Sequence, residues 1–84
     1  MNEIIFQRAL QVLPKFTRNQ EELLRLICQG KDYPYIASVM QKKTSTVRMA
    51  GTKLRWKLKI PIGGNQSVKL VNFVWKAVWD ANES

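Results

Sequence analysis

The sequence predicts a small all-α protein with about five helices, one of them an additional helix at the N-terminus. With 84 residues the chain is long enough for one domain, and its hydrophobic fraction of 45% is normal for a globular protein. Apolar residues recur three or four positions apart in successive segments, as in helices that share one core. We divide the chain into an N-terminal helix with its connection, residues 1–15, and a main helical domain, residues 16–80.

The first expected helix begins at Asn2 and ends at Leu13. Pro14 ends it, because the residue before a proline avoids the helical region. Lys15 and Phe16 form a short connection to the next helix. The apolar side of this first helix consists of Ile5 or Phe6, Ala9, Leu10 and Leu13.

The second expected helix begins with a capping box. The Thr17 hydroxyl can accept a hydrogen bond from the Gln20 amide, while the Gln20 side chain reaches back to the Thr17 amide. Gly30 is suited to end this helix, because a left-handed conformation costs glycine little. The core-facing positions are Gln20, Leu23, Leu24 and Ile27.

The third expected helix has Asp32 as its N-cap, and Pro34 is tolerated in its first turn. Its apolar positions are Tyr35, Ile36, Val39 and Met40. A fourth helix, over residues 43–59, follows after a tight turn and has two different sides. Its apolar side consists of Val47, Leu54 and Leu58, with the small residues Ala50 and Gly51 between them. On the opposite side we expect Arg48, Thr52, Arg55 and Lys59.

A break at residues 61–64 precedes the last helix, which Asn65 caps and which runs to about Trp79. One apolar stripe of this helix consists of Val68, Val71, Trp75 and Val78. The apolar surface is widened by Leu70, Phe73, Val74 and Ala77. A helix this apolar must be covered on two sides. The protein's own core covers one side, and either a second copy of the chain or the N-terminal helix covers the other.

The charge of the chain is strongly positive and unevenly distributed. The formal net charge is +8, and every acidic residue lies at or before Asp32 or at or after Asp80. Such a block of basic and neutral residues usually marks a surface for nucleic acid or for an anionic membrane. A solvated basic surface without a partner is the plain alternative.

Several classes of function are excluded by composition. The chain has one cysteine, Cys28, and no histidine, so we expect no disulfide, no zinc site and a reduced, cytoplasmic setting. It has no glycine-rich phosphate loop and no pair of carboxylates in an apolar setting, so we expect neither an enzyme nor a cofactor. No apolar run approaches the ~20 residues that span a bilayer.

The third and fourth helices form a helix-turn-helix pattern, in which the second helix is basic and begins with Thr-Ser-Thr-Val-Arg. The positions that carry a family pattern are Phe16, Thr17, Leu23, Leu24, Leu26, Ile27, Gly30, Ile36, Ala37, Met40, Thr46, Val47, Arg48, Leu54, Lys57 and Leu58. In this order, without a gap, they resemble the LuxR/GerE-type (NarL-type) DNA-binding domain. A further apolar helix follows, as in that family.

The chain departs from the family pattern at several positions. The family usually has Arg-Glu at residues 19–20, serine at Lys43, histidine at Ala50 and glycine at Lys59. The segment 61–64 also looks longer than usual. The sequence is therefore similar to a divergent member, and we expect a standalone domain without the receiver or ligand-binding domain of most relatives.

The resemblance implies a transcription regulator that binds double-stranded DNA with its 43–59 helix in the major groove. Carried over by position, Arg48, Met49 and Thr52 face base edges. Arg48 suits bidentate pairing with guanine, and a phosphate contact is its plainer alternative. Met49 suits the methyl group of thymine. The expected phosphate contacts are Lys42, Lys43, Thr44, Lys53, Arg55 and Lys59.

The resemblance also implies a weak homodimer, because the last helix of such domains pairs with its twin. The expected contact residues are Val71, Val74, Trp75 and Val78. A second family with a similar pattern is region four of sigma factors. In an alternative from another class, the fold serves as an adaptor that binds another regulator or RNA polymerase. Trp56 does not fit groove binding, and either the N-terminal helix or a protein partner covers it.

Overall fold

The computed structural model describes the backbone of residues 1–60 and 66–83 and the side chains of residues 1–60 and 68–80. The described chain is all-helical, with α1 (Glu3–Val12), α2 (Arg18–Cys28), α3 (Tyr33–Met40), α4 (Thr44–Leu58) and α5 (Gln66–Glu83). The predicted fold class, a small all-α domain of five helices, is confirmed. The expected break at 61–64 and the cap at Asn65 lie outside the described residues.

Helices α2 and α3 begin at the caps that the sequence predicts, while Asn2, expected as the first residue of its helix, is the N-cap of α1. The Asn2 side chain accepts a hydrogen bond from the Ile5 amide at 2.9 Å. At α2 the Gln20 amide donates to the Thr17 hydroxyl at 3.2 Å, and the Thr17 amide donates to Gln20 Oε1 at 2.9 Å. Asp32 accepts the Tyr35 amide at 2.9 Å and so begins α3.

Three helices end with the same backbone closure, in which an amide reaches back to the carbonyl five residues earlier. These amide–carbonyl pairs are Lys31–Leu26 at 3.1 Å, Lys42–Ala37 at 2.9 Å and Ile60–Arg55 at 2.9 Å. The residue before each of these amides is left-handed, with φ of 82° at Gly30, 56° at Gln41 and 59° at Lys59. The role of Gly30 is as predicted, while Gln41 and Lys59 adopt this conformation without being glycine.

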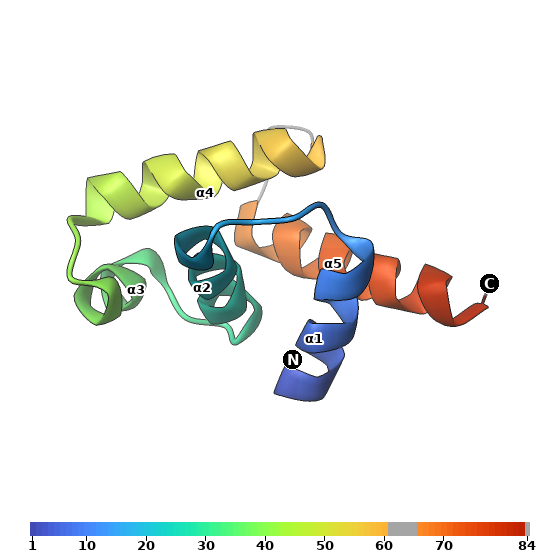
Figure 1. Cartoon of the computed structure of the whole chain (residues 1–84). Coiled ribbons are helices and arrows are strands. Elements are labelled where there is room, and N and C mark those ends of the chain that lie inside the picture. Colours follow the sequence, from blue (N-terminus) through green and yellow to red (C-terminus); the bar gives the residue numbers. More distant parts are fainter. Residues whose placement is uncertain (61–65, 84) are drawn as a thin grey trace.

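The core is arranged around α2, which packs against both α4 and α5 (Figure 1). On one side α3 packs on α4, and on the other side α1 packs on α5. The largest fully buried side chains are Phe6, Leu23, Leu24, Ile27, Ile36, Val47, Leu54, Leu70 and Val74. They come from all five helices, so one continuous core holds α4 in place.

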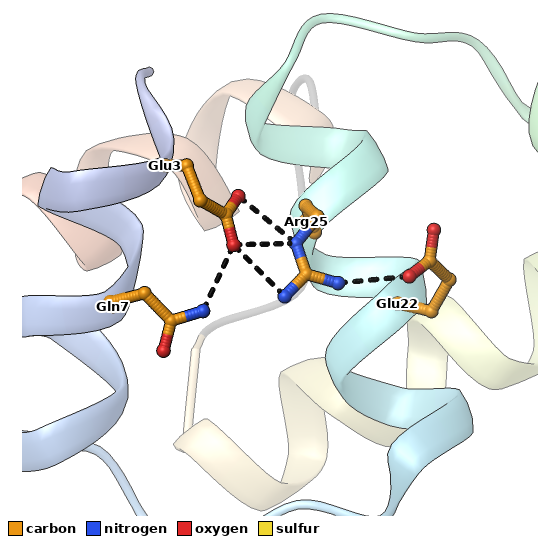
Figure 2. Close-up of polar contacts among 4 residues, drawn as sticks. All are labelled: Glu3, Gln7, Glu22 and Arg25. Atoms are coloured by element: carbon orange, nitrogen blue, oxygen red, sulfur yellow. Dashed lines mark hydrogen bonds and ion pairs between the residues drawn. The ribbon is translucent and has the colours of Figure 1, made fainter.

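The N-terminal helix belongs to this core. Phe6 and Ala9 are fully buried, and the Met1 ammonium group donates to the Cys28 carbonyl at 3.3 Å. Figure 2 shows Arg25 of α2 between two carboxylates, with Nη2 at 3.1 Å from Glu3 of α1 and Nη1 at 2.9 Å from Glu22. Helix α1 also packs on α5. Of the two expected covers of the second side of α5, a second copy of the chain or the N-terminal helix, the structure shows the N-terminal helix.

The last helix differs from the prediction in length and in orientation. It continues to Glu83, beyond the expected end at Trp79. Val74 and Val78, two of the expected pairing residues, lie in the protein's own core with Leu70. This part of the prediction was wrong, because both sides of α5 are apolar and the periodicity does not say which one turns inward. Trp75 is exposed and Val71 is half-buried.

On α3 only part of the predicted apolar surface is buried. Ile36 and Ala37 are in the core, whereas Tyr35 and Val39 are about half exposed, at 49% and 48%. The reason is the short length of α3, which packs on α4 alone among its larger contacts. No helix of the described chain is long and apolar enough to cross a membrane.

Candidate nucleic-acid interface

The candidate interface is built on α4, which lies along the upper edge of the molecule in Figure 1. Val47, Leu54 and Leu58 of this helix are buried toward α2 and α3, as predicted. The opposite side of α4 is left to solvent. Because α4 is supported along its inner side by two other helices, its outer side is presented on a rigid scaffold.

The three residues expected to face base edges share the outer part of α4. Arg48 and Met49 are exposed, and Thr52 is half-buried one turn later. Residues at i, i+1 and i+4 cover neighbouring positions on one side of a helix. The structure therefore brings the three residues together, in the N-terminal half of the helix.

Five of the six expected phosphate contacts fall into two groups on α4. Lys42, Lys43 and the half-buried Thr44 lie at the N-terminus of α4, where Lys43 is the N-cap and provides no side-chain hydrogen bond. The first amides of the helix are thus not capped by a side chain, and such amides bind anions readily. Lys53 and Lys59 are exposed farther along the helix.

Arg55 differs from the prediction, which put it on the solvent side of α4. Only 8% of the residue is exposed. Its Nη2 donates to Thr52 Oγ1 at 3.0 Å, and its Nη1 donates to Tyr33 Oη at 3.5 Å. Gly51, four residues earlier, has no side chain, and the Tyr33 hydroxyl of α3 occupies that space. The buried sector of α4 is therefore wider than the apolar pattern indicates, and it includes Arg55.

Positive charge on α4 is not neutralised within the described part of the protein. The segment from Lys42 to Lys59 contains seven lysines and arginines and no acid. Both ion pairs between described side chains belong to Arg25, which binds Glu3 and Glu22 away from α4. Lys57 lies 5.0 Å from the Phe16 ring and donates to Gln20 at 3.5 Å, so its contacts are also with neutral groups.

Trp56 is not covered by the N-terminal helix. It is 61% exposed on the outer side of α4, and Met49, two turns earlier on that side, is 62% exposed. The expectation that the N-terminal helix covers Trp56 was therefore wrong. A sequence pattern cannot separate a buried from an exposed tryptophan when the neighbouring side chains are lysines with long apolar stems.

The possible metal ligands among the described residues are the acidic side chains and the Cys28 thiol. No group of three or more acidic, histidine or cysteine side chains lies close enough there to hold a metal ion. Burial raises the pKa of the Cys28 thiol to about 11, which is unfavourable for a nucleophile.

No protein-family model, curated protein or solved structure gives a significant match to this chain. The resemblance to the LuxR/GerE type stays a prediction from the residues themselves.

Proposed function

We propose that this protein binds duplex DNA, with α3 and α4 as the helix-turn-helix pair and α4 in the major groove. The observation that carries the proposal is the charge of α4. This helix is supported on one side, open on the other, and basic with no carboxylate partner among the described side chains. An unneutralised basic helix on a rigid domain suits the phosphate backbone of DNA.

In this proposal the two ends of α4 have different roles. Arg48 reads guanine, Met49 contacts the methyl group of thymine, and Thr52 lies at the same base edges. The uncapped N-terminus with Lys42 and Lys43 binds one phosphate group, and Lys53 binds another. The protein then acts as a small transcription regulator on DNA in the cytoplasm.

We further propose that two copies pair weakly on DNA through α5. Val68, Trp75 and Trp79 are 51%, 42% and 65% exposed, and their spacing puts them on one side of the helix. Val74 and Val78 were also expected to contact the second copy, but both are buried in the protein's own core. The proposed contact residues are therefore Val68, Val71, Trp75 and Trp79. A two-fold pair gives two α4 helices for adjacent half-sites.

A fluorescence titration of labelled duplex DNA over a series of KCl concentrations tests the main proposal. With several phosphates neutralised, the affinity falls by orders of magnitude on a modest increase in salt. Selection of bound sequences from a random duplex pool then gives the preferred site. Weak binding with a flat salt response contradicts the proposal.

The exposure of Met49 and Trp56 favours a second candidate, the adaptor. Two large apolar side chains on the outer side of a basic helix suit a protein partner such as RNA polymerase or another regulator. The same DNA titration separates the two candidates, because an adaptor without a DNA role gives no enriched sequence. For such an adaptor, Trp56→Ser abolishes binding of the protein partner.

A further inference from the structure

A guanidinium group without a countercharge is buried at the junction of α3 and α4. Arg55 is more than nine-tenths buried, and its Nε–H has no hydrogen-bond partner among the described residues. Its two acceptors, Thr52 Oγ1 and Tyr33 Oη, are neutral hydroxyls, and the contact with Tyr33 is long at 3.5 Å. A guanidinium carries five N–H donors, so the site has more donors than acceptors.

No described carboxylate neutralises Arg55. The acid that precedes Tyr33 in the chain, Asp32, accepts the Tyr35 amide and forms no ion pair with Arg55. Both ion pairs among the described side chains use Arg25 instead. Burying a charge in the interior of a protein is costly unless the charge is paired. A countercharge from outside the chain would remove that cost.

Of the two hydroxyl groups that contact Arg55, one has a proton that could be donated to an anion from outside the chain. Thr52 Oγ1 accepts from Arg55 and donates to the Arg48 carbonyl at 3.1 Å, so its proton is already used. Tyr33 Oη accepts from Arg55, and its own proton is not used in any contact that the structure shows. Tyr33 is half-buried, which leaves part of its side chain open to solvent.

We infer that Tyr33 and Arg55 form a seat for one phosphate of the bound DNA. The Tyr33 hydroxyl donates to a phosphate oxygen, and the Arg55 guanidinium provides a positive charge 3.5 Å from that hydroxyl. A charge in a low-dielectric setting attracts an anion more strongly than an exposed lysine does. The inference rests on the proposed DNA binding and names a phosphate contact shared by α3 and α4, which fixes how deeply α4 enters the groove.

The seat predicts opposite effects on folding and on binding. In the free protein, replacing Arg55 by methionine removes an unpaired buried charge and keeps an unbranched apolar stem in its place. The midpoint of thermal unfolding therefore rises. The same substitution weakens DNA binding, because the phosphate loses its charge partner. Replacing an exposed cation such as Lys53 weakens DNA binding but does not raise the midpoint of thermal unfolding.

The experiment compares wild type, Arg55→Met, Tyr33→Phe and the control Lys53→Met on one labelled duplex over a KCl series, with thermal unfolding of each free protein. For Arg55→Met we expect several-fold weaker binding, a log–log salt slope smaller by roughly 0.9, and a raised unfolding midpoint. For Tyr33→Phe we expect weaker binding with the slope unchanged, because no charge is lost. For Lys53→Met we expect a smaller slope with an unchanged midpoint.

If Arg55→Met binds DNA with the affinity and salt slope of wild type, the inferred phosphate contact at Tyr33 and Arg55 is wrong. The proposed DNA binding is still supported in that case, provided that wild type binds in a salt-dependent way. A lowered unfolding midpoint for Arg55→Met also overturns the seat, because it shows that the arginine is a structural residue. If Arg55→Met does not fold, unchanged binding by Tyr33→Phe overturns it. Absence of salt-dependent binding by wild type overturns both the seat and the proposed function.

Discussion

The hydroxyl of Tyr33 in α3 occupies the space that a side chain on Gly51 in α4 would need. A Cβ atom at Gly51 would lie 2.9 Å from Tyr33 Oη, but 3.5 Å and 3.6 Å from the ring carbons Cζ and Cε1. Only the hydroxyl oxygen is therefore too close, since the ring distances are ordinary van der Waals contacts. Glycine inside a helix costs about 1 kcal/mol relative to alanine, and the close approach of α3 and α4 accounts for its presence.

Gly51→Ala should have opposite effects in two backgrounds. In wild type we expect it to lower the free energy of unfolding, because the new Cβ displaces the Tyr33 hydroxyl that accepts from Arg55. In the Tyr33→Phe background the hydroxyl is gone, and the alanine should stabilise by up to about 1 kcal/mol through helix propensity. Urea unfolding of the four proteins measures the coupling. Equal effects in both backgrounds would show that Tyr33 does not limit this position.

Helix α3 ends with a non-glycine residue in the left-handed region. Gln41 has φ of 56°, and L-residues there cost roughly 1–2 kcal/mol relative to a right-handed conformation. Gln41→Gly should therefore raise the free energy of unfolding by about 1 kcal/mol without a change of charge. The measurement is chemical denaturation.

Gly30→Ala is the matched control for this prediction. Gly30 has φ of 82°, and a Cβ there would meet no atom within 4 Å. Any loss of stability on Gly30→Ala is therefore due to the backbone alone. We expect Gln41→Gly to stabilise the protein and Gly30→Ala to destabilise it. If both substitutions stabilised it, or if neither did, the left-handed backbone would not be the source of strain at these two positions.

The contact between α1 and α2 predicts a dependence of stability on pH. Hydrogen bonds from Gln7 and Arg25 hold the pKa of the Glu3 carboxyl below its ordinary value of 4.5 (Figure 2). A carboxyl whose pKa is lowered by folding stabilises the fold at pH values above its unfolded pKa. This contribution is lost as the pH falls through the lowered folded-state pKa.

Glu3→Gln should accordingly lower the midpoint of thermal unfolding at neutral pH. The effect is small, because Glu3 is exposed and solvent screens its ion pair with Arg25. The difference from wild type should shrink as the pH falls below about 4.5. Glu21→Gln, which removes an acid of α2 outside this cluster, serves as the control. A difference that grows toward acid pH would contradict the linkage.

Local signals in the sequence were sufficient for much of the fold. The caps at Thr17 and Asp32 and the turn at Gly30 depend on residues within a few positions of one another, so a short stretch of sequence specifies them. The inward side of α5 depends instead on which of two apolar sides meets α1 and α2. No local pattern contains that choice, and the wrong side was chosen for Val74 and Val78.

The candidate site was predictable in charge but not in geometry. The absence of acids between Lys42 and Lys59 is visible in the sequence, and so is the outward position of Arg48. Burial of Arg55 depends on the Tyr33 ring, which comes from another helix. A glycine in mid-helix four residues before Arg55 was the one signal for it, since such a glycine often marks the close approach of another element.

The roles proposed for Arg48 and Lys53 differ in their effect on specificity. Arg48→Ala should weaken binding to the selected sequence by about 1–3 kcal/mol and have less effect on random duplex. Lys53→Ala should weaken both alike and reduce the salt slope by about 1. One competition assay with both duplexes measures the two variants. Equal losses on both duplexes for Arg48→Ala would make it a phosphate contact only.

The exposed stripe on α5 is the proposed contact for pairing of two copies on DNA. Trp75 and Trp79 lie one turn apart on the side opposite the buried Leu70 and Val74. Removing such apolar surface from water stabilises a pair by roughly 25 cal/mol per Å². The loss of translational and rotational entropy on association opposes pairing through so small a surface. We therefore expect monomers in solution at low concentration and pairing on a two-fold site.

Substitution of both tryptophans by glutamine should abolish that pairing and leave the helical circular-dichroism signal unchanged, because neither side chain is in the core. Val74→Asn, one residue away, should instead reduce the helical signal or the unfolding midpoint, because Val74 is fully buried. Analytical ultracentrifugation with and without a two-fold duplex gives the stoichiometry. Pairing that survives the double glutamine variant would move the contact away from this stripe, to the exposed Met49 and Trp56 of α4 or to α1.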